Sequence, residues 1–441
     1  GDEVAFWTPR FDKTEQAVTA SDLVFVGYGV TAPEYAWNDY DGIDVTGKTV
    51  VMFINDPCFI TKDESLFKGR AMTYYGRWTY TFEEAARRGA AAVIIVHETE
   101  PAAYGWQVVR NSNTGSKSYL DNADGNAERS SVHAWITSEV AREFFASAGL
   151  NYDDLRIAAN KRGFKAVPMS GLKLSARTVS SVKKLTTRNV IGVLKGNVRP
   201  EEYLLYMGHW DHIGVKSDVP GDDNIYNGAV DNASGISAIL EIAETFAKSP
   251  NPPRRSIMVA AVTLEEQGLL GSEYLARNPI VPVNQIVAGL NFDGMGPAGP
   301  SRDMTVVGSG ASELENILGR VLKKQGRYTS PDPEPEKGFF YRSDHISLAK
   351  VGVPMLYAGA GADLVEGGRP AGQALRQDYA KNRYHQPSDE FDPNWDLRGP
   401  VQTMQTMHAV GSRIANSKAW PKWYRGNEFR SIREQSLKAR K

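Results

Sequence analysis

From about residue 186 onward, hydrophobic strand-like segments alternate with amphipathic helical segments. The strand-like runs are EYLLYMG (202–208), SIMVAAVTL (256–264), IVAGLNFD (286–293) and VPMLYAG (353–359). The helical patterns between them lie at 234–249, 269–278 and 312–326. This alternation predicts an α/β fold with a mixed, mostly parallel sheet and helices on both faces. In such folds ligands bind at the carboxyl ends of the strands, so residues directly after strands are the first functional candidates.

Five potential metal ligands follow these strands or lie in the connecting loops: His209, Asp231, Glu266, Asp293 and His385. A carboxylate at a semi-buried strand end is costly unless it is paired or bound to a metal. Five nitrogen and oxygen ligands exceed what one tetrahedral zinc ion requires. They suit two zinc ions that share a bridging carboxylate, although cobalt or manganese would fit nearly as well. A two-metal centre of this kind narrows the expected chemistry to hydrolysis.

Two further acidic residues lie beside these candidates. Asp211 follows His209 by two positions on an extended segment, so both side chains can point the same way. A carboxylate behind a ligating histidine fixes its tautomer, and we expect Asp211 to support His209 in this way. Glu265 precedes Glu266 at the end of a buried strand. Adjacent carboxylates there point in different directions, so Glu265 is the candidate for proton transfer.

The overall composition limits the other function classes. Fifty-one basic and 52 acidic side chains nearly cancel, which gives no support for a nucleic acid or an anionic membrane as partner. No apolar run approaches the roughly 20 residues that a membrane helix needs. The single cysteine, Cys58, excludes an internal disulfide. The chain begins with Gly1 rather than methionine, and we expect that a signal segment has been removed from a periplasmic or secreted protein.

Taken together, the motifs resemble a known family, the co-catalytic dinuclear zinc aminopeptidases. The matching stretches are MGHWDHIG (207–214), GAVDNASG (228–235), LEEQGLLGS (264–272), NFDGMG (291–296) and YHQPSDE (384–390). The resemblance implies an exopeptidase that removes N-terminal residues from peptides, with no nucleic acid or membrane partner. It makes no prediction of the oligomeric state.

The same resemblance implies individual roles. His209 and Asp293 would bind one zinc ion, Glu266 and His385 would bind the other, and Asp231 would bridge them. Glu265 would be the general base. Tyr341, in the element Tyr341-Arg342-Ser343-Asp344-His345, would stabilise the oxyanion. A cis peptide bond is expected between Asp231 and Asn232, and Asp389 is a candidate to support His385.

The first part of the chain resembles a protease-associated domain, a smaller β-rich module. The matching stretches are GYGVTAPEYAWNDYDGIDVTGKTVVMFINDP (27–57) and FEEAARRGAAAVIIV (82–96). We therefore expect residues 20–185 to form an inserted protease-associated domain, and residues 1–19 and 186–441 to form the catalytic domain. Relatives carry a helical segment of the catalytic domain before the insertion, whereas only about twenty residues precede it in this chain.

Three alternative functions are consistent with part of this sequence pattern. A carboxypeptidase of the same family would need cationic side chains for the carboxylate of the substrate, and Arg342, Arg369 and Arg376 are candidates. A glutaminyl cyclase would bind a single zinc ion. A non-enzymatic receptor on the same fold would be expected to have lost metal ligands, whereas this sequence has all five.

Overall fold

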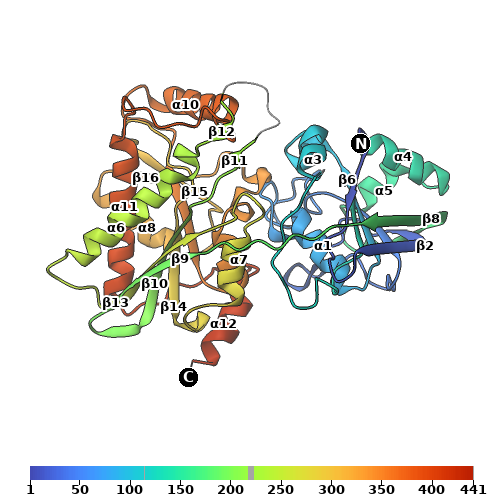
Figure 1. Cartoon of the computed structure of the whole chain (residues 1–441), viewed down its shortest axis with the longest axis horizontal. Coiled ribbons are helices and arrows are strands. Elements are labelled where there is room, and N and C mark those ends of the chain that lie inside the picture. The colour runs from blue at the N-terminus through green and yellow to red at the C-terminus, as the bar shows by residue number, and fades with distance from the viewer. Residues whose placement is uncertain (114, 217–222, 441) are drawn as a thin grey trace. The chain divides into compact units, whose positions relative to one another are not determined.

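The computed structural model describes residues 1–113, 115–216 and 223–440, and Figure 1 shows the course of the chain. The chain divides into two compact units. The first unit comprises Gly1–Leu185 and the short segment Glu334–Tyr341, and the second comprises Thr186–Pro333 and Arg342–Lys441. The division after Leu185 falls where the sequence pattern changes to alternating strands and helices.

The first unit is built on a six-stranded sheet in the order β1-β7-β6-β5-β2-β8. Its strands are β1 (Val4–Trp7), β2 (Glu15–Phe25), β5 (Thr49–Phe53), β6 (Ala92–His97), β7 (Val132–Thr137) and β8 (Val167–Val179). The three central pairings are parallel and the two outermost are antiparallel. Strands β5 and β6 are buried along their whole length because apolar clusters cover both faces of the sheet.

Short helices surround this sheet. They are α1 (Trp78–Arg87), α2 (Thr99–Ala102), α3 (Trp106–Asn113), α4 (Ser138–Ser147) and α5 (Tyr152–Ala158). A small hairpin is formed by β3 (Thr31–Ala32) and β4 (Trp37–Asn38). The segment Glu334–Tyr341 adds the 3₁₀ turns η5 (Pro335–Lys337) and η6 (Phe339–Tyr341).

Residues 1–19 lie in a different place from the one predicted. They were expected to belong with the catalytic domain, but they form part of the first sheet. Strand β1 pairs with β7, and the first half of β2 pairs with β8. The alternation of buried and exposed residues in β2 is interrupted at Thr19 and Ala20, where the register shifts, but β2 pairs with β8 on both sides of this point. Backbone pairing therefore keeps this segment in the first unit.

The second unit is built on a seven-stranded sheet in the order β16-β15-β17-β14-β10-β13-β9. Its strands are β9 (Val190–Leu194), β10 (Arg199–His209), β13 (Arg255–Val262), β14 (Ile286–Asn291), β15 (Asp303–Val307), β16 (Tyr328–Pro331) and β17 (Met355–Ala360). Four pairings are parallel, and two, β13 with β9 and β15 with β17, are antiparallel. The parallel core β13-β10-β14-β17 brings the carboxyl ends of these strands to one edge. A small hairpin pairs β11 (Gly214–Val215) with β12 (Ile225–Tyr226).

Helices cover both faces of this sheet. Helices α6 (Ser234–Ala247), α8 (Leu314–Lys324) and α11 (Arg398–Asn416) share one apolar cluster with Leu204 of β10 and Leu356 of β17. The neighbouring Tyr357 points to the opposite face, where its ring lies 5.2 Å from that of His345 in α9 (His345–Lys350). Helix α9 in turn packs against α7 (Leu270–Arg277), and Figure 1 shows α6 and α7 on opposite sides of the strands. The predicted mixed, mostly parallel α/β fold is therefore confirmed.

The C-terminal segment docks on the second unit. Helix α12 (Arg430–Lys438) begins only at Arg430. Before it, Trp423 is fully buried and donates a hydrogen bond from its indole nitrogen to the carbonyl of Gly352. Among the described residues, none of the helices combines the length and the apolar character needed to cross a bilayer.

Candidate metal centre

The predicted ligands meet at the carboxyl edge of the second sheet. His209 is the last residue of β10, Glu266 follows β13, and Asp293 follows β14. Asp231 lies in the turn η3 (Ala229–Ala233) that leads into α6. His385 lies after α10 (Gly368–Asn382) and has a left-handed backbone conformation with φ of 58°. This conformation is uncommon for a residue other than glycine, and such positions cluster at functional sites.

Three of these side chains form a first group around His209. Its Nε2 atom lies 3.1 Å from Oδ1 of Asp231 and 3.4 Å from Oδ1 of Asp293. The histidine is 1% exposed, so these contacts lie away from bulk water. The group offers one nitrogen and two carboxylate oxygens to a single point.

The other ligands form a second group around His385. Its Nε2 atom lies 3.3 Å from Oδ2 of Asp231 and 3.2 Å from Oε2 of Glu266. Asp231 therefore turns one oxygen toward each histidine and belongs to both groups. A carboxylate placed in this way has the arrangement needed to bridge two cations.

The spacing of these atoms suits zinc. Two ligand atoms on one tetrahedral zinc ion, each about 2.0–2.1 Å from the metal, lie about 3.3 Å apart. The four contacts of His209 and His385 span 3.1–3.4 Å. These separations are those expected between two ligand atoms on one zinc ion.

The charges of the two groups act on one another. Burial opposes protonation of His209, but the carboxylates of Asp231 and Asp293 outweigh it and raise the pKa of the imidazole. Although burial favours the neutral acid, both histidines lower the pKa of Asp231. Burial, together with the negative charges of Asp293 and Asp344, raises the pKa of Glu265 well above its usual range. The site therefore concentrates negative charge in a buried place, as a cation site does.

Asp211 has a different role from the one predicted. Nδ1 of His209 lies 3.0 Å from the main-chain oxygen of Asp211, while the nearer carboxylate oxygen is 3.8 Å away. The carboxylate instead accepts hydrogen bonds from the backbone N–H groups of Glu265 (3.1 Å) and Glu266 (3.3 Å). The main-chain carbonyl thus orients the histidine, and the carboxylate holds the loop that carries the two glutamates.

Asp389 makes a similar pair of contacts on the other side. It is fully buried and accepts hydrogen bonds from the backbone N–H groups of Val230 (3.0 Å) and Asp231 (3.1 Å). Tyr379 donates a further hydrogen bond from its hydroxyl over 3.3 Å. The expected support of His385 is therefore indirect. Asp389 links the loop that carries His385 to the turn that carries Asp231.

The peptide bond between Asp231 and Asn232 is cis, so this prediction is confirmed. The side chain of Asn232 then joins two loops of the site. Its amide nitrogen donates a hydrogen bond to the carbonyl of Phe292 (2.9 Å), and its oxygen accepts one from the N–H of Gly294 (3.2 Å). Asp293 is held between these two contacts.

The structure adds two side chains that the sequence reasoning did not assign. Nδ1 of His212 lies 2.6 Å from Oε1 of Glu266, and the imidazole is 7% exposed. Asp344 is 1% exposed, and burial raises its pKa to about 7. Both lie inside motifs already recognised, MGHWDHIG and YRSDH. A second histidine three positions after the first ligand was the available signal for His212.

Tyr341 groups with the first unit. Its ring lies 6.0 Å from that of Tyr74, and the nearby carbonyl of Pro335 accepts a hydrogen bond from the N–H of Met72 (3.1 Å). The aromatic segment 71–82 therefore contacts the segment that carries Tyr341. The proposed oxyanion role of this tyrosine stays a prediction from the resemblance.

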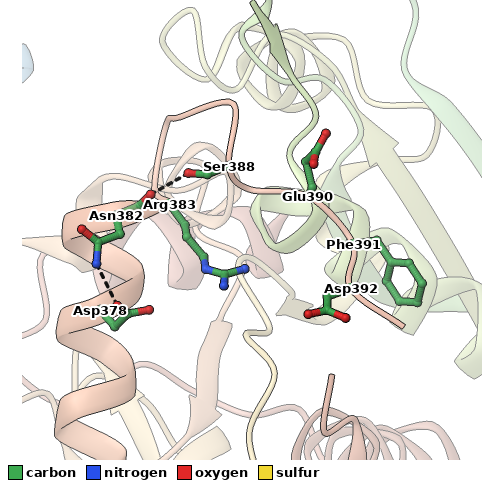
Figure 2. A pocket seen from close by; sticks show the side chains of 7 residues that line it. All are labelled: Asp378, Asn382, Arg383, Ser388, Glu390, Phe391 and Asp392. Atoms are coloured by element: carbon green, nitrogen blue, oxygen red, sulfur yellow. Dashed lines mark hydrogen bonds between the residues drawn. The ribbon is translucent and has the colours of Figure 1, made fainter. Parts of the chain in front are cut away.

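A separate surface hollow lies beside the loop of His385 (Figure 2). It is lined by Asp378, Asn382, Arg383, Ser388, Glu390, Phe391 and Asp392. Its wall is held by hydrogen bonds from Asn382 to Asp378 (2.8 Å) and from Ser388 to the carbonyl of Asn382 (2.6 Å). None of the five predicted ligands lines it, so this hollow is distinct from the metal centre.

Comparison with known proteins gives a family match over the same region. The sequence profile of peptidase family M28 matches residues 189–410, which is half of the chain. A probable zinc metalloprotease of Leptosphaeria maculans is 29% identical over 224 residues, 48% of this chain and 49% of that protein. One from Pyrenophora teres f. teres is 37% identical over 112 residues, 24% of this chain and 22% of that protein. The chain thus spans about half or less of these relatives.

Solved structures give weaker likenesses. An aminopeptidase from Aneurinibacillus sp. strain AM-1 is 20% identical with a TM-score of 0.42, covering 95% of this chain and 82% of that one. A zinc aminopeptidase from Bacillus subtilis is 17% identical with a TM-score of 0.41, covering 94% and 80%. Both TM-scores lie below 0.5, so these likenesses carry no weight for the activity.

Proposed function

Because the chain belongs to peptidase family M28, we propose that its second unit is a dinuclear zinc exopeptidase, and specifically an aminopeptidase. The observation that carries the proposal is the position of Asp231. It is 6% exposed and turns one oxygen toward His209 and the other toward His385. A buried carboxylate shared between two histidine–carboxylate groups is explained by two cations and by little else.

The metal assignment follows the two groups. His209 and Asp293 would hold one zinc ion, Glu266 and His385 would hold the other, and Asp231 would bridge them. Cobalt or manganese would fit the same donors. When bound, the two ions would supply Lewis acidity that polarises the scissile carbonyl and activates a water molecule.

Glu265 is proposed as the general base. It follows β13 next to Glu266, and the hydrogen bond from its backbone N–H to Asp211 fixes its position. Its carboxylate would take the proton of the attacking water and then deliver it to the nitrogen of the departing amine. Tyr341 would donate its hydroxyl proton in a hydrogen bond to the developing oxyanion.

For the first unit we propose a protease-associated domain, on the basis of its sequence resemblance. A periplasmic or secreted location likewise stays a prediction from the sequence.

The carboxypeptidase alternative needs cationic side chains that are free to bind a carboxylate. Arg369 donates a hydrogen bond to the hydroxyl of Tyr328 (3.1 Å). Arg376 donates hydrogen bonds to Thr305 (3.1 Å) and to the carbonyl of Ala360 (2.6 Å). Arg369 is thus engaged with β16 and Arg376 with β15 and β17, so two of the three candidate arginines already have partners, which favours the aminopeptidase.

A single experiment separates the candidates. The purified chain would be loaded with zinc, dialysed and analysed for metal content, and then assayed on aminoacyl-p-nitroanilides and on N-blocked dipeptides with a free C-terminus. Two zinc ions per chain with hydrolysis of the nitroanilides supports the proposal. Hydrolysis of only the N-blocked dipeptides would indicate a carboxypeptidase. One zinc ion with pyroglutamate formation from N-terminal glutamine would indicate a cyclase, and loss of all turnover with bound zinc would indicate a receptor.

A further inference from the structure

His212 is a buried histidine beside the proposed zinc pair that the ligand pattern leaves without a role. It lies in the loop after β10, and its side chain is 7% exposed. Its Nδ1 atom is 2.6 Å from Oε1 of Glu266, and its ring centroid is 5.8 Å from that of His385. In the described part of the chain, neither ring nitrogen of His212 nor Oε1 of Glu266 meets the geometry of a hydrogen bond, so the 2.6 Å separation is a close approach of the imidazole to the carboxylate. A buried imidazole that served only for packing would be more costly than an apolar residue of the same size.

The surrounding backbone is shaped to this ring. Gly228 has φ of 65°, and a Cβ atom added there would lie 2.6 Å from Cγ of His212. A side chain at position 228 would therefore displace the imidazole. The loop that leads to Asp231 thus packs directly on the ring, which holds it against Glu266.

The distances decide between two roles for this histidine. Two atoms bound to one tetrahedral zinc ion lie about 3.3 Å apart, and the contacts of His385 with Glu266 and Asp231 have this spacing, at 3.2 and 3.3 Å. The separation between His212 and Glu266 is 2.6 Å. It is too short for two ligands of one ion and is close to that of a direct charge-assisted contact.

We propose that His212 is a positioning residue that holds Oε1 of Glu266, so that only Oε2 is presented to the zinc ion beside His385. Glu266 would then have one oxygen for the imidazole and one for the metal, whereas both oxygens of Asp231 would be available to metal. This inference depends on the proposed function, because it assigns a partner to one of the proposed zinc ligands. Removing such a partner of a ligand weakens metal binding by about 10–100-fold.

The test measures zinc binding rather than turnover alone. Wild type, His212→Ala, His212→Asn and the control His408→Ala would be prepared as full chains. His408 lies in the same unit, in α11, with its ring 4.6 Å from that of Phe246, and it contacts none of the proposed ligands. Both zinc dissociation constants would be measured by competition with a chromophoric chelator, and the visible spectrum of the cobalt form would report the ligand field.

We expect His212→Ala to raise the dissociation constant of one zinc ion by about 10–100-fold. The dissociation constant of the other ion should stay within about twofold of wild type. His212→Asn places an amide N–H near the position of Nδ1, so it should recover most of that loss, and His408→Ala should match wild type. If the alanine variant does not fold, as judged by circular dichroism, the asparagine variant and the cobalt spectrum carry the test.

Two results would overturn the inference. The first is a His212→Ala variant whose two dissociation constants both match wild type. The second is X-ray absorption of the zinc form showing that the variant loses a coordinated imidazole, because His212 would then be a ligand. A wild-type chain that binds fewer than two zinc ions would instead overturn the proposed function, and this is measured before any variant is compared.

Discussion

In the first unit, buried carboxylates lie among hydrogen-bond donors. Asp39 accepts hydrogen bonds from the backbone of Tyr28 (3.2 Å) and Val30 (3.0 Å) and from the indole of Trp37 (2.7 Å). Asp56 accepts two from Thr73, both at 2.6 Å. These acids join neighbouring loops, and their charge is met locally by N–H and O–H groups.

At the candidate metal centre of the second unit, by contrast, carboxylates lie among other carboxylates. Asp231 and Asp293 share His209, Asp231 and Glu266 share His385, and Glu265 lies within the field of Asp293. Even with His212 beside Glu266, three imidazoles cannot neutralise these four acids. The comparison teaches that the surroundings of a buried acid separate a structural role from a cation site, whereas burial by itself does not.

The largest effect is expected from removing the acid that both groups share. Asp231→Ala should lose at least one zinc ion per chain and reduce aminoacyl-nitroanilide hydrolysis to background, since each group loses an oxygen ligand. Metal analysis after dialysis checks this, with Asp39→Asn in the first unit as the matched control. Full zinc content in Asp231→Ala would contradict the distinction between buried acids with a structural role and buried acids of a cation site.

The next effect concerns an acid that lies in the cluster without binding metal. Glu265→Gln should retain zinc and the fold but lose about 10²–10⁴-fold in kcat, since the amide cannot accept the proton of the water. Zinc content, circular dichroism and steady-state kinetics would be measured together. Activity near wild type would refute the assignment of Glu265, and lost zinc would make it a ligand instead.

A smaller effect is expected at Asp389, an acid of the second unit whose surroundings resemble those of the buried acids in the first unit. Asp389 is surrounded by donors, so Asp389→Ala should keep all five ligands but weaken zinc binding by about 10–100-fold, because the turn that carries Asp231 is released. The control is Asp378→Ala, which removes an exposed carboxylate of the same region. Equal zinc affinity in both variants would show that Asp389 has no influence on the centre.

The smallest effect is expected in the first unit. Asp39→Asn should lower the free energy of unfolding by about 1–3 kcal/mol, because one amide oxygen cannot accept from all three N–H donors. Urea unfolding of the zinc-loaded protein measures it. The zinc dissociation constants should be unchanged, and a shift in either of them would show that the two kinds of acid are not separable.

Much of the second unit could be predicted because its signals are local. Apolar runs such as SIMVAAVTL predicted buried strands, and amphipathic periods predicted the helices between them. Residues that follow parallel strands converge at one edge, which is why His209, Glu266 and Asp293 were expected together. The assignment of residues 1–19 failed because strand pairing is non-local, and a short N-terminal segment carries no mark of the sheet that it joins.

The sequence by itself determined the fold class, the family and the order of the five candidate ligands, since these depend on periodicity and on motifs within short stretches. Only the tertiary structure decided what the neighbouring acids and His212 contact. The carboxylate of Asp211 holds the backbone of Glu265 and Glu266, that of Asp389 holds Val230 and Asp231, and His212 lies against Glu266. The physical reason is that the partner of a side chain depends on where loops distant in sequence come to lie. The residues next to it along the chain do not determine the positions of those loops.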